Sequence, residues 1–313
     1  MTDRARHLLP LVAAVLVLVG GGLVVAAVSG AFDGDAPTVG GGSDADAPAA
    51  ETAARPDVDR FDSRRAFALL RAQVERGPRP AGSEALRELA PWLADRLPRG
   101  RLQRVPGGLQ NVVGRIPGRG KPIVVAAHYD TKDLPGFVGA NDGAGGTAAV
   151  LEIARALRRA DRPRTAPPIR FVLFDGEESP DDSADFYSTG LRGSRHYARR
   201  HARDLRALIL LDFVAEKGAM RIPREAGSDP ALWRRLRAAA RKVGAGATFP
   251  AGTVGEVLDD HTPFARRGVP AIDLIDFTFP CWHETCDDMD VVSARSLDLA
   301  GEAVVQMLLD WER

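Results

Sequence analysis

The sequence predicts an α/β protein: a three-layer α/β/α sandwich around a central, mostly parallel mixed sheet, preceded by one transmembrane helix. Two observations predict the sandwich. Short apolar runs alternate along the chain with longer segments of helical periodicity, an order typical of a parallel sheet covered by helices. Several of these runs are apolar at nearly every position, as expected for strands buried on both faces. A third observation, an uncharged N-terminal stretch, predicts the membrane helix.

The N-terminal stretch covers residues 8–32, which carry no charge, and two arginines precede it while two aspartates follow it closely. Its apolar part is long enough to cross the hydrocarbon core as a helix. The positive-inside rule then places the N-terminus in the cytoplasm and everything after residue 32 outside it. We therefore expect residues 1–32 to be a single-pass membrane anchor. The alternative is a cleaved signal peptide and a secreted product, because small residues lie at 27–31.

A second segment, residues 33–59, consists mainly of Gly, Ala, Pro, Asp and Ser. It has too few large apolar residues to offset the entropy of ordering, so it is predicted to be a flexible linker. The folded domain is predicted over residues 60–313.

Within that domain the periodicity of apolar residues predicts both kinds of element. Helices are predicted over 61–75, 84–97, 146–159, 193–203, 230–243 and 293–311, and strands over 111–116, 122–127, 169–174, 207–211 and 271–275. Ligands of such sheets bind beyond the carboxyl ends of the strands.

Side chains that can bind a metal follow nearly every predicted strand: His128, Asp142, Glu177, Glu178, Asp212 and His283. One acidic residue at a strand end is commonly a helix cap, but several on separate elements are not explained in that way. Carboxylates that converge would repel each other unless a cation joined them. Histidine and carboxylate ligands together suit Zn²⁺ in an open, catalytic site, whereas a closed structural site is more often rich in cysteine.

The overall charge excludes one class of partner. Lys plus Arg and Asp plus Glu both total 42, so the net charge is zero. This balance gives no electrostatic reason to expect nucleic acid as a partner.

Several separated motifs carry a family resemblance: AHYD, GANDGAGGTAAVLEIA, FDGEE, GSRH, LLD and a late WH. In this order they resemble the zinc aminopeptidase superfamily from about residue 77 to the C-terminus. The resemblance implies that Asp142, Glu178 and His283 bind the principal zinc and that Glu177 is the general acid/base. It also implies that His128 and Asp212 complete a second zinc site in the aminopeptidases.

Within this superfamily the sequence is more similar to the glutaminyl cyclases. The stretch VLDDHTPFARRGVPAIDLI resembles them and contains Asp259, and Trp282 directly precedes His283 as it does in the cyclases. The resemblance implies a glutaminyl-peptide cyclotransferase that converts the N-terminal Gln of peptides to pyroglutamate and releases ammonia. Glu177, Asp212 and Asp259 would handle protons, Trp282 would wall the glutamine pocket, and one zinc would be bound.

The sequence also departs from the cyclases. Leu258 stands where they commonly have Gln, and residues 179–192 lack their pocket Trp, for which Phe186 or Tyr187 is a substitute. The GANDGAGG loop is closer to the aminopeptidase form. A zinc aminopeptidase that holds two zinc ions and removes N-terminal residues by hydrolysis therefore remains the alternative.

Four further expectations concern single residues. Cys281 and Cys286 bracket His283, and both a disulfide that stiffens this loop and a pair of free thiols are compatible with the sequence. Asp130 is placed to orient the ring of His128. Asp260 is expected to cap a helix that begins at Thr262. His196 and His201, on an Arg-rich helix, are expected to be solvated: both lie in the predicted helix over 193–203.

Overall fold

The computed structural model of the chain describes residues 56, 58–180 and 184–311. The predicted membrane anchor and most of the predicted linker lie outside these residues. Among the residues that are described, no helix combines the length and the apolar character that crossing a bilayer requires.

In the described part of the chain, six strands form the central sheet in the order β1-β2-β4-β3-β5-β8. Strands β4, β3, β5 and β8 are parallel, while β1 and β2 form an antiparallel edge. The bounds are β1 Arg101–Val105, β2 Leu109–Ile116, β3 Ile123–His128, β4 Ile169–Phe174, β5 Ala207–Leu211 and β8 Ala271–Leu274. Two short strands, β6 Arg224–Glu225 and β7 Thr253–Val254, pair separately. The predicted α/β fold with a mixed sheet is confirmed.

The helices of the described chain are α1 Ser63–Val74, α2 Glu84–Ala94, α3 Gly146–Arg159, α4 Phe186–Thr189, α5 Arg192–His201, α6 Pro230–Lys242, α7 Thr262–Ala265 and α8 Ala294–Asp310, with helical turns η1 Ala140–Gly145, η2 Ala202–Asp204 and η3 Gly246–Thr248. Of these, α1, α2, α3, α5, α6 and α8 lie at the predicted positions and α7 begins at Thr262 as expected, whereas α4 was not predicted. Local chemistry explains several starts. The Ser83 hydroxyl accepts the Leu86 N–H at the start of α2, and the Asp229 carboxylate accepts two N–H groups ahead of Pro230 in α6.

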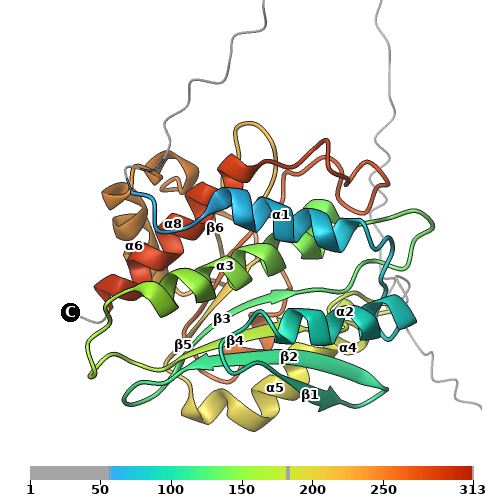
Figure 1. Cartoon of the computed structure of the whole chain (residues 1–313), viewed down its shortest axis with the longest axis horizontal. Coiled ribbons are helices and arrows are strands. Elements are labelled where there is room, and N and C mark those ends of the chain that lie inside the picture. The colour runs from blue at the N-terminus through green and yellow to red at the C-terminus, as the bar shows by residue number, and fades with distance from the viewer. Residues whose placement is uncertain (1–55, 57, 181–183, 312–313) are drawn as a thin grey trace, which may run out of the picture. The chain divides into compact units, whose positions relative to one another are not determined.

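The central strands β3 and β5 are buried along their whole length and apolar at every position before His128, because both faces of the sheet are covered there. On β3, Val125 and Ala127 pack in the large core with α1, α3, α6 and α8, whereas Val124 and Ala126 pack with α5 and α7. Figure 1 shows α1, α3 and α8 on one side of the sheet and α5 on the other. Alternate residues of one strand thus serve two cores, which explains the continuous apolar runs in the sequence.

One close contact ties the start of α1 to α8. The Phe61 side chain is fully buried against Gly301 of α8, and a Cβ atom added to Gly301 would overlap the Phe61 ring. The Phe61 N–H also donates to the Glu302 carboxylate, at 2.6 Å. Glycine is therefore required at this helical position by packing.

We predict that Gly301→Ala destabilises the protein by about 1–3 kcal/mol, because overpacking outweighs the better helix propensity of alanine. Urea unfolding of the purified protein measures the change. Phe61→Leu removes the ring that the added methyl group would overlap. Gly301→Ala should therefore cost less stability in a Phe61→Leu background than in the unsubstituted protein. Equal costs in both backgrounds would contradict the proposed contact.

Candidate metal centre and active site

The carboxyl ends of the parallel strands bring the predicted site residues together. His128 is the last residue of β3, Asp212 directly follows β5, and Glu177 and Glu178 lie in the turn after β4. His283 comes from the segment between β8 and α8. These side chains therefore converge at one edge of the sheet, as predicted.

Asp142 reaches the same edge from the kinked turn η1 that leads into α3. Its backbone angles (φ −81°, ψ 98°) are not helical, and Gly143 follows with φ 92°. A Cβ atom on Gly143 would lie 2.6 Å from the Asp130 carbonyl oxygen and 3.1 Å from His128 Cε1. Only glycine fits both this backbone conformation and this space, so the Gly-rich loop is a requirement of the turn that presents Asp142.

The first cluster consists of Asp142, Glu178 and His283, the predicted ligands of the principal zinc. The Nε2 atom of His283 lies 3.3 Å from Glu178 Oε1 and 3.7 Å from Asp142 Oδ2. Candidate ligand atoms of the three residues all lie within 4.8 Å of one another. One metal ion can therefore contact all three.

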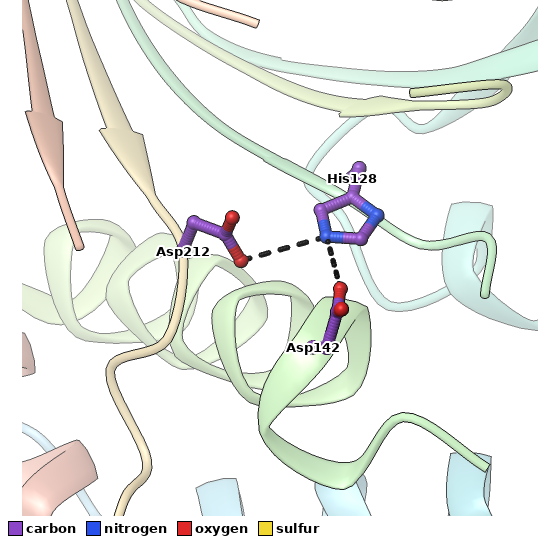
Figure 2. Close-up of side chains that lie close together, drawn as sticks. All are labelled: His128, Asp142 and Asp212. Atoms are coloured by element: carbon purple, nitrogen blue, oxygen red, sulfur yellow. Dashed lines mark ion pairs between the residues drawn. The ribbon is translucent and has the colours of Figure 1, made fainter. Parts of the chain in front are cut away.

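The second cluster shares Asp142 with the first. The Nε2 atom of His128 lies 3.1 Å from Asp142 Oδ1 and 3.5 Å from Asp212 Oδ1. Figure 2 shows both carboxylates directed at the same ring nitrogen. Because one oxygen of Asp142 faces His128 and the other faces His283, Asp142 belongs to both clusters.

Charge and hydrogen bonding both indicate that a cation fits here. Burial alone lowers the pKa of His128, but contacts with Asp130, Asp142 and Asp212 raise it well above its ordinary value. Burial and repulsion from Asp142 raise the pKa of Glu178. Neither ring nitrogen of His128 has a hydrogen-bond partner, although both are buried. Such a set of carboxylate and imidazole donors matches the ligands that zinc takes.

A second layer of side chains holds the ligands in place. The Asp130 carboxylate accepts the backbone N–H groups of Glu177 (3.3 Å) and Glu178 (3.2 Å). It lies 3.6 Å from His128 Nδ1, so its hydrogen bonds go to the Glu177–Glu178 turn more directly than to the ring. The AHYD motif indicates this residue, but no local pattern predicts its backbone partners, which lie 47 and 48 residues away.

The candidate ligand His283 lies inside a covalent loop. Cys281 and Cys286 form a disulfide. Of the two alternatives that the sequence allows, a disulfide and a pair of free thiols, the structure therefore contains the disulfide. The Trp282 ring stacks on the His283 ring, with 4.6 Å between centroids.

A cavity of about 750 Å³ opens over the first cluster. Its walls include the candidate ligands, Glu177, Asp212 and Asp259, together with Phe186, Leu258, Phe277 and Trp282. Of the two aromatic substitutes for the missing pocket tryptophan, Phe186 lines the cavity. Tyr187 instead lies against the Arg266 guanidinium, 3.8 Å from the ring centroid.

Two carboxyl groups of the cavity, those of Glu177 and Asp259, have raised pKa values. Burial and repulsion from Glu178 raise the pKa of Glu177 well above its ordinary value. Burial and repulsion from Asp212 raise the pKa of Asp259 to about 6. Behind Asp259, the His261 ring lies between Glu225 (3.4 Å) and Asp273 (3.8 Å), both fully buried. Raised carboxyl pKa values in a cavity are typical of groups that exchange protons with a substrate.

Two expectations for single residues are wrong. Asp260 does not cap α7: its carboxyl group is buried, and the Thr262 N–H is instead bonded to the Asp259 carbonyl oxygen. His196 is not solvated, since only 5% of its surface is exposed, while His201 is half-buried beside Tyr197. Their place on the covered side of α5 explains the burial.

Comparison with known proteins gives a consistent relationship. The family model described as peptidase family M28 matches residues 111–308. Glutaminyl-peptide cyclotransferase of Bos taurus is 29% identical over 67% of this chain and 69% of its own length. A glutaminyl cyclase structure from an Acidobacteriales bacterium has a TM-score of 0.69 and 31% identity, over 86% of this chain and 99% of that one. A leucine aminopeptidase precursor from Bacteroides thetaiotaomicron has a TM-score of 0.73 and 25% identity, over 82% and 99%.

The mammalian relatives are longer than the matched region. The chain spans 69%, 54% and 56% of the lengths of three of them. The match to the Acidobacteriales structure, in contrast, is almost complete for that chain.

We predict that Asp130→Asn weakens zinc binding by about 10- to 100-fold, as is typical when a residue that orients ligands is replaced. The amide can accept only one of the two backbone N–H groups through an oxygen. Competition with a chromophoric chelator measures the affinity. Asp133→Asn, an exposed residue nearby, is the control and should leave the affinity unchanged. Equal affinities of the two variants would contradict the role given to Asp130.

Proposed function

This chain belongs to peptidase family M28, and we propose that it is a zinc-dependent glutaminyl-peptide cyclotransferase, which closes the N-terminal Gln of peptides to pyroglutamate. The carrying observation is that Glu177, Asp259 and Trp282 line one cavity with the candidate ligands Asp142, Glu178 and His283. The cyclotransferases and the cyclase among the similar proteins support the same activity.

The reaction needs a proton carrier but no water. The α-amine nitrogen of the substrate attacks the carbonyl carbon of its own side-chain amide, a new C–N bond closes the ring, and the old C–N bond breaks to release ammonia. One proton must move from the attacking amine to the departing nitrogen. Glu177 is the proposed carrier, because its pKa is raised and it lies in the cavity wall beside the candidate ligand Glu178.

The metal completes this assignment. Asp142, Glu178 and His283 are the proposed ligands of one zinc ion, which when bound would polarise the amide carbonyl of the substrate. Asp212 and Asp259 are proposed to share the proton load of Glu177, since both are buried carboxyl groups of the same cavity with raised pKa values.

The apolar part of the cavity is proposed to receive the glutamine side chain. Trp282 is 47% exposed and stacks on His283, so its indole forms a wall next to the candidate metal. Phe186 supplies a second aromatic surface, and Leu258 presents a methyl surface where the cyclases commonly have a polar group. Once the substrate fills the cavity, such apolar walls would leave less room for water, which would compete with the amine as nucleophile.

One observation favours a second candidate function. His128, Asp142 and Asp212 form a second potential metal cluster that shares Asp142 with the first. If both clusters held a metal ion, the site would suit an aminopeptidase, in which the metals would supply activation of water for hydrolysis of the first peptide bond. The leucine aminopeptidase precursor among the similar structures is consistent with this candidate.

We also propose where the enzyme works. Residues 1–32 would anchor the protein to a membrane or be cleaved as a signal, residues 33–59 would be a spacer, and residues 60–313 would form the catalytic domain outside the cytoplasm. The disulfide between Cys281 and Cys286 supports this location, because disulfides persist in oxidising compartments.

We predict that the protein converts a peptide with N-terminal Gln to its pyroglutamyl form and does not release leucine from a matched peptide with N-terminal Leu. Mass spectrometry distinguishes the loss of ammonia from the release of an amino acid. Metal analysis of the same sample should give one tightly bound zinc per chain. Release of free leucine together with two zinc ions would favour the aminopeptidase instead.

We predict that Glu177→Gln lowers turnover by at least about 100-fold while zinc stays bound, because the amide cannot carry the proton. Glu178→Gln, the neighbouring substitution, should instead lose zinc. Activity and zinc content are measured on both variants. If the two zinc results are reversed, the roles of Glu177 and Glu178 have been exchanged.

A further inference from the structure

The disulfide between Cys281 and Cys286 encloses a candidate metal ligand. The segment 275–293, which the structure describes in full, connects β8 to α8 through turns and one isolated bridge at Val292. His283 lies in the middle of the six-residue loop closed by the two cysteines. The imidazole is therefore not held by a helix or a strand of its own.

The backbone of His283 is held in a conformation that a histidine rarely adopts. Its φ angle is 53°, in the left-handed region that disfavours residues with a Cβ atom. The conformation directs Nε2 to within 3.3 Å of Glu178 Oε1. The surroundings must stabilise this conformation, and they include the disulfide-closed loop, the stacked Trp282 ring and the Glu284 N–H bonded to the Cys281 carbonyl oxygen.

The residue that follows this loop also contacts the turn of a second candidate ligand, Asp142. Asp287 directly follows Cys286, and its carboxylate accepts the backbone N–H groups of Asn141 (2.7 Å) and Asp142 (2.9 Å). Its carbonyl oxygen accepts the Ala140 N–H at 3.2 Å. The kinked turn that presents Asp142 is therefore fastened to the residue next to the disulfide.

The two cysteines differ in exposure. Cys281 is buried in a small apolar cluster with Phe213, Ile275 and Phe279, whereas Cys286 is exposed. The first sulfur is fixed to the body of the domain and the second residue is open to solvent. A reductant can therefore approach the bond from the Cys286 side.

We propose that the Cys281–Cys286 disulfide positions the ligands His283 and Asp142 together, so that reducing this bond weakens the hold on the metal. The proposal rests on the proposed zinc site. It does not depend on whether the reaction at that site is cyclisation or hydrolysis, because it concerns only how the ligands are held.

The reduction balances with a named partner. A dithiol gives up two electrons and two protons and becomes a disulfide, while the S–S bond breaks and both cysteines become thiols. In the laboratory a water-soluble phosphine does the same: it takes oxygen from water, becomes a phosphine oxide, and the two sulfurs receive the electrons and protons.

The test measures the zinc affinity of the full-length protein before and after reduction by such a phosphine, by competition with a chromophoric chelator. We expect reduction to raise the zinc Kd at least about tenfold, the loss typical when ligand orientation is disturbed. The chain contains only two cysteines, so Cys281→Ser/Cys286→Ser is a matched control. It should bind zinc as weakly as the reduced protein and should not respond to the phosphine.

A second measurement separates positioning from general stabilisation. The cross-link closes a short loop, with a sequence separation of 5, so it constrains the unfolded chain little. The Tm of the zinc-free protein should therefore shift only slightly on reduction. An unchanged zinc Kd with a lower Tm would overturn the proposal.

Two other outcomes would also contradict the proposed role of the disulfide. Tighter zinc binding after reduction, absent in the Ser variant, would mean that the thiolates join the ligands, and this would overturn a positioning role. Failure of the oxidised protein to hold zinc would overturn the metal centre itself, and the inference with it. Asp287→Asn, which keeps the disulfide, should also weaken zinc binding, and reduction should then add less than it does in the unsubstituted chain.

Discussion

Three buried carboxylates converge at one edge of the sheet, where their negative charges would repel one another. The side chains of Asp142, Glu178 and Asp212 are each at most 9% exposed, and they lie close to one another. Isolated charges in such surroundings would be strongly destabilising. Asp142 sits between His128 and His283 and is part of both clusters. A cation bound at this point would offset the charge of the carboxylates, and the neighbouring elements bring the candidate ligands together there.

The fold supplies positive character around the site in two further ways. Backbone N–H groups face Asp130 and Asp287, the two carboxylates behind the ligands. Arg79 is fully buried and donates to the carbonyl oxygens of Val138 and Gly139, just before the turn of Asp142. Burial lowers its pKa to about 10, so it remains charged at neutral pH. The charged groups behind the candidate ligands are therefore themselves paired, the carboxylates with backbone N–H groups and the guanidinium with carbonyl oxygens.

Periodic patterns of apolar residues predict helices and strands, whereas the role of a side chain whose partners lie far away in the sequence leaves no such pattern. The buried strands and amphipathic helices were predicted to within three residues because burial on both faces leaves an apolar run. Strand β1 was missed, since this edge strand carries Arg101 and Arg104 and is mostly exposed. The Asp260 error has the same origin: helix-cap chemistry is local, whereas the burial of this carboxyl group depends on tertiary packing. Asp287 gave no local signal for its role, because its partners are about 145 residues away.

The candidate ligands alone do not separate the two chemistries of the superfamily, because both need the same first metal. What differs is the handling of protons and water. Hydrolysis requires a water next to the metal, whereas cyclisation requires an amine that loses one proton and an amide nitrogen that gains it. Asp259 adds a buried carboxyl group with a pKa of about 6 to the wall that contains Glu177. Trp282, Phe186 and Leu258 add apolar side chains to the same cavity. Carboxyl groups of raised pKa beside apolar side chains suit a reaction in which the substrate is its own nucleophile.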